Sequence, residues 1–136
     1  MLQTVFTFLG IAHSICFLCL LIVALVALGC GPTSSIGAAA RSLAIACASL
    51  STLLLATYLI EYVIALQSQN PYERDVLAFV QGGPQAYQYW LPLMFGGCLP
   101  QLIWVPKIRH SLVALSSLAG VLIVSKAAVS VLATFA

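Results

Sequence analysis

The sequence predicts an all-α membrane protein: a four-transmembrane-helix bundle that runs up, down, up and down, with both termini on the outer side. Its 136 residues are 62% hydrophobic and only 6% charged, with a mean hydropathy of +1.12. A soluble domain of this size needs more charge on its surface. The apolar residues form four runs, each long enough for the ~20 residues that cross a bilayer core. Such runs exclude a membrane barrel, whose strands are short and alternating.

The first two spans are expected over residues 4–30 and 39–67, with the turn Gly-Pro-Thr-Ser-Ser between them. The first run lacks a basic region before it and is too long for the apolar part of a signal peptide, so we expect a retained helix. The polar stretch 68–85 after the second span is expected to be an outer loop. The first half of the chain therefore predicts a helical hairpin followed by one long polar connection.

The third and fourth spans are expected over residues 86–105 and 111–134, separated by a short basic turn. A proline inside a helix removes a backbone hydrogen bond and can kink the axis, whereas glycine permits close approach by a neighbouring helix. The third span carries both kinds of residue: Pro92, Gly96, Gly97 and Pro100. We therefore expect a kinked helix that packs tightly against a neighbour.

Basic residues near the helix ends predict the orientation. Arg41, Lys107 and Arg109 fall on the same side of a four-span topology, and such residues are enriched on the cytoplasmic side of membranes. That orientation puts both termini and the 68–85 loop outside. We expect a single domain, residues 1–136, that passes several times through the inner (cytoplasmic) membrane of a bacterium, with lipid around it and no nucleic-acid partner.

No haem or metal is expected on this chain alone. Cys16 and Cys19 have the spacing of a redox or metal-binding pair, but they lie mid-helix, and the 68–85 loop holds no second pair. All five cysteines are interpreted as small apolar packing residues. A membrane haem commonly takes two histidines at similar depth. His13 and His110 are expected at different depths, so they cannot share an iron.

Three ionisable residues are expected inside the spans, where they are costly and therefore candidates for function: His13, Glu61 and Lys126. Counting ~1.5 Å per residue from the outer helix ends puts them about 14, 9 and 15 Å deep, all in the outer half. We expect Glu61 or His13 to accept a proton. The alternatives are structural. Lys126 could snorkel or pair with Glu61, and His13 could bond a backbone carbonyl.

Every tyrosine of the chain is expected near this same membrane face. An aromatic belt accounts for part of the pattern, since such rings prefer the interface, but only Trp104 is expected at the inner face. The asymmetry favours a pocket for a flat, partly polar ring that enters from lipid, such as a quinone head group. Besides the two proton acceptors, the candidate quinone-binding residues are Tyr58, Tyr62, Arg74, Asp75, Tyr87, Tyr89, Trp90 and Lys126.

Three segments between Tyr58 and Arg109 form a distinctive order: YLIEYVIALQSQNPYE, GGPQAYQYW and CLPQLIWVPKIR. This order resembles the NrfD/PsrC-like membrane subunits of polysulfide-reductase type, including those of alternative complex III. The family pattern has an acidic helix residue, an outer loop with Asn and Glu, Gly-Pro, a Tyr-Trp helix start, Pro-Gln and a basic helix end. The matching positions are Glu61, Asn70, Glu73, Gly83, Pro84, Tyr89, Trp90, Pro100, Gln101 and Arg109.

The resemblance implies quinol chemistry near the outer membrane face, beside other membrane subunits and a subunit that carries haem or iron–sulfur clusters. Family members have about twice as many spans, so the chain could be a split half, a self-pairing relative or a remnant that serves assembly. The main hypothesis is a quinone-binding subunit of a quinol-linked oxidoreductase complex, without a redox centre of its own. The alternatives are a structural membrane anchor and a small proton-coupled exporter.

Overall fold

The structure is a computed structural model that describes the backbone of residues 2–84 and 86–135 and most of their side chains, those of residues 2–6, 80, 88, 133 and 135 excepted. This described chain is helical and contains no strand. Three of its helices are long and apolar enough to span a membrane: α1 (Leu2–Cys30), α2 (Ser35–Gln67) and α6 (Leu112–Phe135). The predicted all-helical, multi-pass membrane class is confirmed to that extent.

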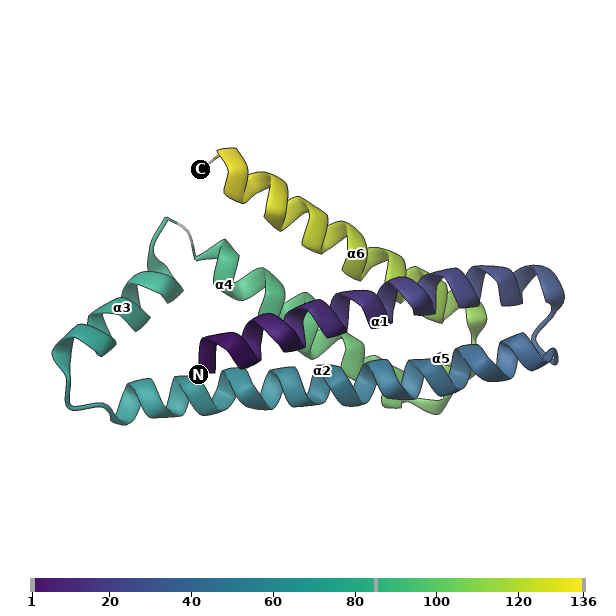
Figure 1. Cartoon of the computed structure of the whole chain (residues 1–136), viewed down its shortest axis with the longest axis horizontal. Helices are drawn as coiled ribbons and strands as arrows, with labels where there is room; N and C mark the ends of the chain where they lie inside the picture. Colours follow the sequence, from purple (N-terminus) through teal and green to yellow (C-terminus); the bar gives the residue numbers. More distant parts are fainter. Residues whose placement is uncertain (1, 85, 136) are drawn as a thin grey trace.

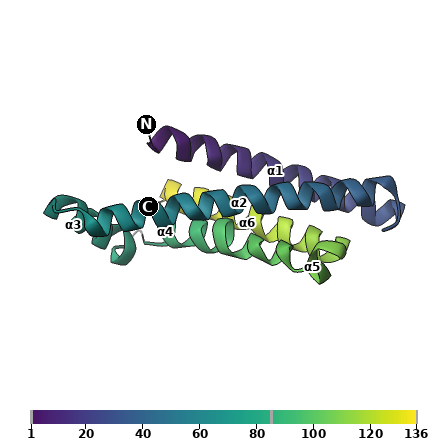
Figure 2. The ribbon, with the colours of Figure 1, turned by 90° about the horizontal axis from the view of Figure 1, so that it is seen from below.

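The long helices lie side by side (Figures 1 and 2), with α1 packed against both α2 and α6. The start of α1 and the end of α6 lie towards the end of the molecule that carries α3 (Pro71–Gly82). The turn between α1 and α2 lies at the opposite end (Figure 1). At 33 residues, α2 is about 50 Å long, which exceeds a bilayer core of about 30 Å. The helix is therefore longer than one membrane crossing requires, and α3 packs against it.

The interior of the bundle combines small residues with a few large side chains such as Phe17, Leu20 and Leu115, while many other large aliphatic side chains point outwards. Ile11, Leu18 and Ile22 on α1 are about half exposed. In lipid, large apolar side chains gain nothing from burial, and small residues let helix backbones approach closely. The buried stripe of α2 recurs every three or four residues, as one helix face requires: Gly37, Ala40, Ala44, Cys47, Ala48, Ser51 and Leu54.

The region predicted as a third continuous span, residues 86–105, is instead a broken helix. It comprises α4 (Tyr87–Leu91), a π-helical segment η1 (Pro92–Cys98) and a 3₁₀ segment η2 (Leu99–Trp104). Each of the last two segments begins at or next to a proline, which has no N–H to continue the α-helical hydrogen-bond ladder. The wide turns of η1 pack against α2 and α6. A short helix, α5 (Pro106–His110), then leads into α6.

The 68–85 loop is also more ordered than predicted, because α3 occupies most of it. Asn70 caps the start of α3 by accepting a hydrogen bond from the backbone N–H of Tyr72 at 3.1 Å. Pro71 follows at the first helical position and Glu73 lies in the first turn. All three positions suit a helix start. The helix packs against α2 and α4, so it forms a wall beside the last turns of α2 and beside α4.

Candidate functional site

His13 lies at the centre of a buried polar cluster that joins four elements. Its side chain is fully buried. Its Nε2 atom lies 2.9 Å from the Ser51 hydroxyl on α2 and 3.0 Å from the Gly96 carbonyl oxygen on η1. Its Nδ1 atom lies 2.8 Å from the Lys126 ammonium on α6. A single imidazole therefore fixes α1 against three neighbours.

The partners of His13 determine where its proton is. A carbonyl oxygen only accepts hydrogen bonds, so Nε2 must carry the hydrogen that faces Gly96. The Ser51 hydroxyl donates its own hydrogen to the Cys47 carbonyl at 2.9 Å, so it too acts as an acceptor for Nε2. The bare Nδ1 atom then accepts from the Lys126 ammonium. The ring is neutral in this arrangement, and the positive charge of the cluster belongs to Lys126.

The Gly96 carbonyl is available to His13 because of Pro100. In a regular α-helix, the N–H of the residue four positions later would bond this carbonyl, but proline has no N–H. A Cβ added at Gly96 would lie 3.8 Å from His13 Cε1, an ordinary van der Waals contact, so the approach of the ring does not itself require glycine. The break in the third predicted span thus supplies the acceptor that orients the imidazole.

Lys126 stands between this cluster and a cavity. Its ammonium donates to His13 and, at 2.7 Å, to the Ser14 hydroxyl. The Ser14 hydroxyl in turn donates to the Gly10 carbonyl at 2.7 Å. An ammonium has three N–H donors, and only these two acceptors for it are found in the described part of the chain. One donor is therefore available to a ligand.

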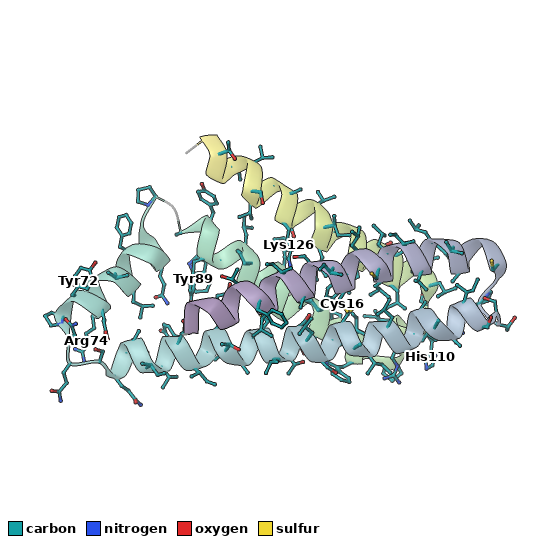
Figure 3. The ribbon with its side chains drawn as sticks, viewed as in Figure 1. Cys16, Tyr72, Arg74, Tyr89, His110 and Lys126 are labelled. Atoms are coloured by element: carbon teal, nitrogen blue, oxygen red, sulfur yellow. The ribbon has the colours of Figure 1, made fainter. Side chains whose placement is uncertain are left out.

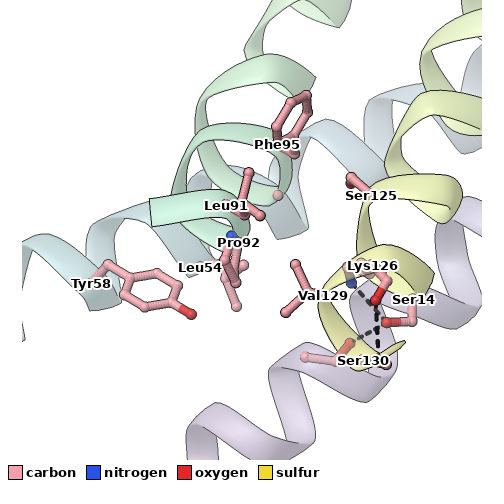
Figure 4. Close-up of a pocket in the computed structure, with 12 residues that line it drawn as sticks. Ser14, Leu54, Tyr58, Leu91, Pro92, Phe95, Ser125, Lys126, Val129 and Ser130 are labelled. Carbon is pink, nitrogen blue, oxygen red and sulfur yellow. Dashed lines mark hydrogen bonds between the residues drawn. The ribbon is translucent and has the colours of Figure 1, made fainter. Parts of the chain in front are cut away.

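The cavity beside Lys126 has a volume of about 340 Å³ and is shown in Figure 4. We call it the Lys126 pocket. Its walls come from α1, α2, α4, η1 and α6, and the volume is within the ~300–1,000 Å³ of typical ligand pockets. Polar groups of α6 lie on one side and apolar or aromatic groups on the other: Ser125, Lys126 and Ser130, opposite Leu54, Tyr58, Leu91, Pro92 and Phe95.

Glu61 does not line this pocket. Ten residues separate it from Ser51 on α2, which corresponds to about 15 Å along the helix axis. It lines a second cavity of about 530 Å³ together with Tyr58, Tyr62 and Tyr89. We call this second cavity the tyrosine pocket. The alternative in which Glu61 pairs with Lys126 is not found, because the described polar contacts of the ammonium are with α1.

The remaining predicted quinone-binding residues are dispersed. Arg74 Nε donates to the Ser68 carbonyl at 2.8 Å, which covers the end of α2. Trp90 Nε1 donates to the Gln81 carbonyl at 2.9 Å. Neither Asp75 nor Tyr87 lines the Lys126 pocket or the tyrosine pocket. Figure 3 shows Tyr72 and Arg74 on α3 at one end of the molecule and His110 at the other. Of the predicted quinone-binding set, Tyr58 and Lys126 line the Lys126 pocket.

The cysteines are free thiols, and the Cys-x-x-Cys pair does not come together. Cys16 instead faces Cys47 across the interface of α1 and α2, with their sulfur atoms 2.7 Å apart. Cys19 is exposed on the outer face of α1. Within the described residues, no group of three or more His, Cys, Asp or Glu side chains is arranged to hold a metal ion.

Three members of the polar cluster were not predicted: Ser14, Ser51 and Gly96. A signal existed for Gly96, because Pro100 four residues later frees its carbonyl. Ser14 follows His13 directly, and nothing in the sequence singled it out from other helix serines. Ser51 belongs to the small-residue stripe of α2, which predicts burial but no particular partner.

Comparison of the chain with protein families, with characterised proteins and with solved structures finds no match. The similarity to NrfD/PsrC-like subunits therefore stays a prediction. Function is inferred from the chemistry of the two pockets.

Proposed function

We propose that this chain is an integral membrane subunit of a quinol-linked electron-transfer complex and that the Lys126 pocket receives the head group of a quinone or quinol. One observation carries the proposal. The Lys126 ammonium has an N–H donor to spare beside an apolar and aromatic cavity, inside a bundle of membrane-spanning helices. A donor held in such a place suits a ligand that enters from lipid and presents a hydrogen-bond acceptor.

The pocket offers matching groups for both ligand forms. A quinone presents carbonyl oxygens, to which the Lys126 ammonium can donate. A quinol presents hydroxyl groups, which need acceptors. Ser125 and Ser130 supply these, because each already donates its own hydrogen to a backbone carbonyl of α6, at 2.9 and 3.0 Å. Phe95 and Leu54 provide apolar surface for the flat ring.

Oxidation of a bound quinol releases two protons and two electrons. We assign the first proton-accepting role to the His13–Lys126 pair, since its two nitrogens share a hydrogen bond at 2.8 Å and Lys126 borders the cavity. In this exchange the Lys126 ammonium passes its shared hydrogen to His13 Nδ1, and the freed Lys126 nitrogen takes the quinol proton, so the pair gains one positive charge and Glu61 is not required. We assign the electron acceptor to a partner subunit that carries haem or iron–sulfur clusters, as the resemblance to NrfD/PsrC-like subunits implies.

The proposed topology has four spans, of which the broken segment from α4 to η2 is the third. Basic residues near the ends of the helices support an orientation with both termini and α3 outside. Arg41 at the start of α2 donates to the Gly37 carbonyl at 3.0 Å, and Lys107 and Arg109 lie on α5. These basic residues favour the cytoplasmic side of a bacterial inner membrane. The Lys126 pocket then opens in the outer half of the bilayer.

A charge-removal pair tests the quinone site. Lys126→Met keeps most of the side-chain volume and removes the donor, whereas Lys107→Met removes the same charge from an exposed position outside the pocket. The proteins, purified with any accompanying subunits in dodecyl maltoside, are titrated with decylubiquinone and with menadione. A hydrogen bond to a charged group contributes about 1.5–3 kcal/mol, so Lys126→Met is expected to weaken binding about 10–100-fold, and Lys107→Met to leave it unchanged.

Two results would contradict the proposal: wild-type protein that binds neither quinone, or Lys126→Met protein that binds as wild type does. The structural anchor would then be the better explanation. One observation favours that alternative independently, because the His13 cluster cross-links four elements whether or not a ligand is present. In that case Lys126→Met would lower the thermal stability of the purified protein and change no binding activity.

A further inference from the structure

The tyrosine pocket lies where the last turns of α2 meet α3 and α4, and it has a volume of about 530 Å³. Four aromatic rings and two carboxylates line it: Tyr58, Tyr62, Tyr72, Tyr89, Glu61 and Glu73. The other described lining residues are aliphatic. The wall thus combines negative charge, aromatic surface and hydrocarbon, with no basic side chain among the described residues that form it.

The nearest candidate cation along the chain does not neutralise these carboxylates. Arg74 follows Glu73 directly, but its guanidinium turns to the end of α2. It donates to the Ser68 carbonyl at 2.8 Å and to the Leu66 carbonyl at 3.4 Å. It lines a different cavity. Two acidic groups at one cavity wall without a facing cation favour a positively charged ligand.

The tyrosine rings belong to the cavity wall, where such a ligand would meet them. Tyr58 and Tyr89 meet edge to face, with centroids 6.0 Å apart and planes at 89°. The face of an aromatic ring is negative, so a cation is attracted when it lies within about 6 Å of the ring centroid. Tyr72 lines the pocket from α3 and is 72% exposed. A membrane aromatic belt alone explains rings at an interface, but not their convergence with Glu61 on one cavity.

We propose that the tyrosine pocket binds the positively charged end of a lipophilic organic cation, with Glu61 and Glu73 balancing its charge and the tyrosine rings contacting its onium centre. The aliphatic lining from Ile64 and Leu77 accommodates the attached hydrocarbon. This inference goes beyond the quinone site. It concerns a different cavity, and neither proposal depends on the other.

The test measures equilibrium binding of radiolabelled tetraphenylphosphonium to the purified protein in dodecyl maltoside, which is uncharged, with empty micelles as the baseline. Glu61→Gln keeps the side-chain shape and is expected to weaken binding at least ~10-fold, the effect of about 1.4 kcal/mol. Asp75→Asn is the matched control, because it removes one negative charge from α3 but does not line the pocket. It is expected to change affinity less than about twofold, since exposed charges are screened by salt.

The aromatic contribution is tested separately. Tyr62→Phe keeps the ring and is expected to bind tetraphenylphosphonium as wild type does, whereas Tyr62→Leu is expected to bind about 2–5-fold more weakly, as the loss of one cation–π contact requires. The proposal is overturned if wild type binds no tetraphenylphosphonium above the micelle baseline. It is equally overturned if Asp75→Asn weakens binding as much as Glu61→Gln, because overall charge would then account for the result.

The natural cation could be a free organic molecule or the ammonium head group of a lipid. Mixed micelles with phosphatidylcholine or phosphatidylethanolamine, compared with diacylglycerol of the same chains, distinguish the two sources. Displacement of tetraphenylphosphonium by the first two lipids and not by diacylglycerol supports a lipid head group, and no displacement supports a free cation. Displacement of tetraphenylphosphonium by all three lipids would contradict the proposal that the pocket recognises the positive charge of its ligand. Lys126→Met is expected to leave tetraphenylphosphonium binding intact, so failure of the quinone proposal would be recognised separately.

Discussion

The Lys126 pocket and the tyrosine pocket both use α2 as a wall, yet they are built in opposite ways. Around Lys126, the polar groups bond one another across α1, α2, η1 and α6, with His13 and Ser51 fully excluded from the surface. Around Glu61, the polar groups stand at the wall of a cavity formed by the last turns of α2 and by α3, and Tyr72 is 72% exposed.

This difference teaches which residues carry stability and which are available for binding. A buried polar group destabilises a protein strongly when it loses its partner, and a satisfied network fixes one arrangement of the elements around it. A polar group at an open wall contributes little to folding, because water or lipid head groups can replace its contacts. We therefore expect substitutions near His13 to lower stability and those near Glu61 to change binding alone.

The largest expected effect is that of His13→Ala. The substitution removes three hydrogen bonds, leaves Ser51 and the Lys126 ammonium short of a buried partner, and opens a cavity between α1 and η1. We expect it to lower the free energy of unfolding by about 3–5 kcal/mol. His110→Ala, at an exposed position on α5, is the control and is expected to cost less than ~0.5 kcal/mol. Denaturant titration in detergent measures the free energy of unfolding of both variants. Equal losses for His13→Ala and His110→Ala would show that the buried His13 cluster contributes no special stability.

A medium effect is expected where η1 packs against α2. A Cβ added at Gly97 would lie 3.1 Å from Leu55 Cδ1, which is closer than ordinary van der Waals contact. Gly97→Ala is therefore expected to destabilise the protein by about 1–3 kcal/mol through overpacking. Gly120→Ala on α6 meets nothing within 4 Å, so it is expected to be neutral or to stabilise by up to ~1 kcal/mol. The same denaturant titration measures both variants. A Gly97→Ala protein more stable than wild type would contradict close packing of η1 against α2.

The helical membrane class could be predicted from composition, because lipid offers no partner for backbone polar groups and only long apolar helices satisfy them within one segment. The break in the third span could be predicted only in part. Pro92 and Pro100 marked lost hydrogen bonds, but whether the chain kinks or widens into a π-helix depends on packing against α2. Helix α3, which we did not predict in the 68–85 loop, was predictable, since Asn70, Pro71 and Glu73 form a helix start.

The sequence predicted how deep each ionisable residue lies along its helix, but not towards which neighbouring helix its side chain points. Counting residues put His13 and Lys126 at nearly equal depths of about 14 and 15 Å, and in the structure they are in contact. Glu61, at a different depth, lines another cavity. Which side of a helix faces which neighbour depends on packing among several helices that are apolar on all faces, so hydropathy carries little information about it. For that reason the sequence merged into one site what the structure divides into two.

The smallest expected effect concerns the cap of α3, and it sharpens the comparison because it should change binding without changing the bundle. Asn70→Ala removes the acceptor for the Tyr72 N–H at the start of α3, a loss of about 1 kcal/mol. The helix that carries Glu73 would then open more often, so hydrogen exchange is expected to speed up about fivefold in α3, with slightly weaker tetraphenylphosphonium binding and unchanged exchange in α1.

Ser34→Ala provides the matched control for this cap. Ser34 caps α2 in the same manner, accepting from the Gly37 N–H at 3.1 Å, but at the end of the molecule far from the tyrosine pocket. Its loss is expected to speed exchange only in the first turn of α2 and to leave cation binding unchanged. If Asn70→Ala instead loosened α1 as well, α3 would be part of the cooperative core, and the open pocket would share the stabilising role that we assign to the His13 cluster.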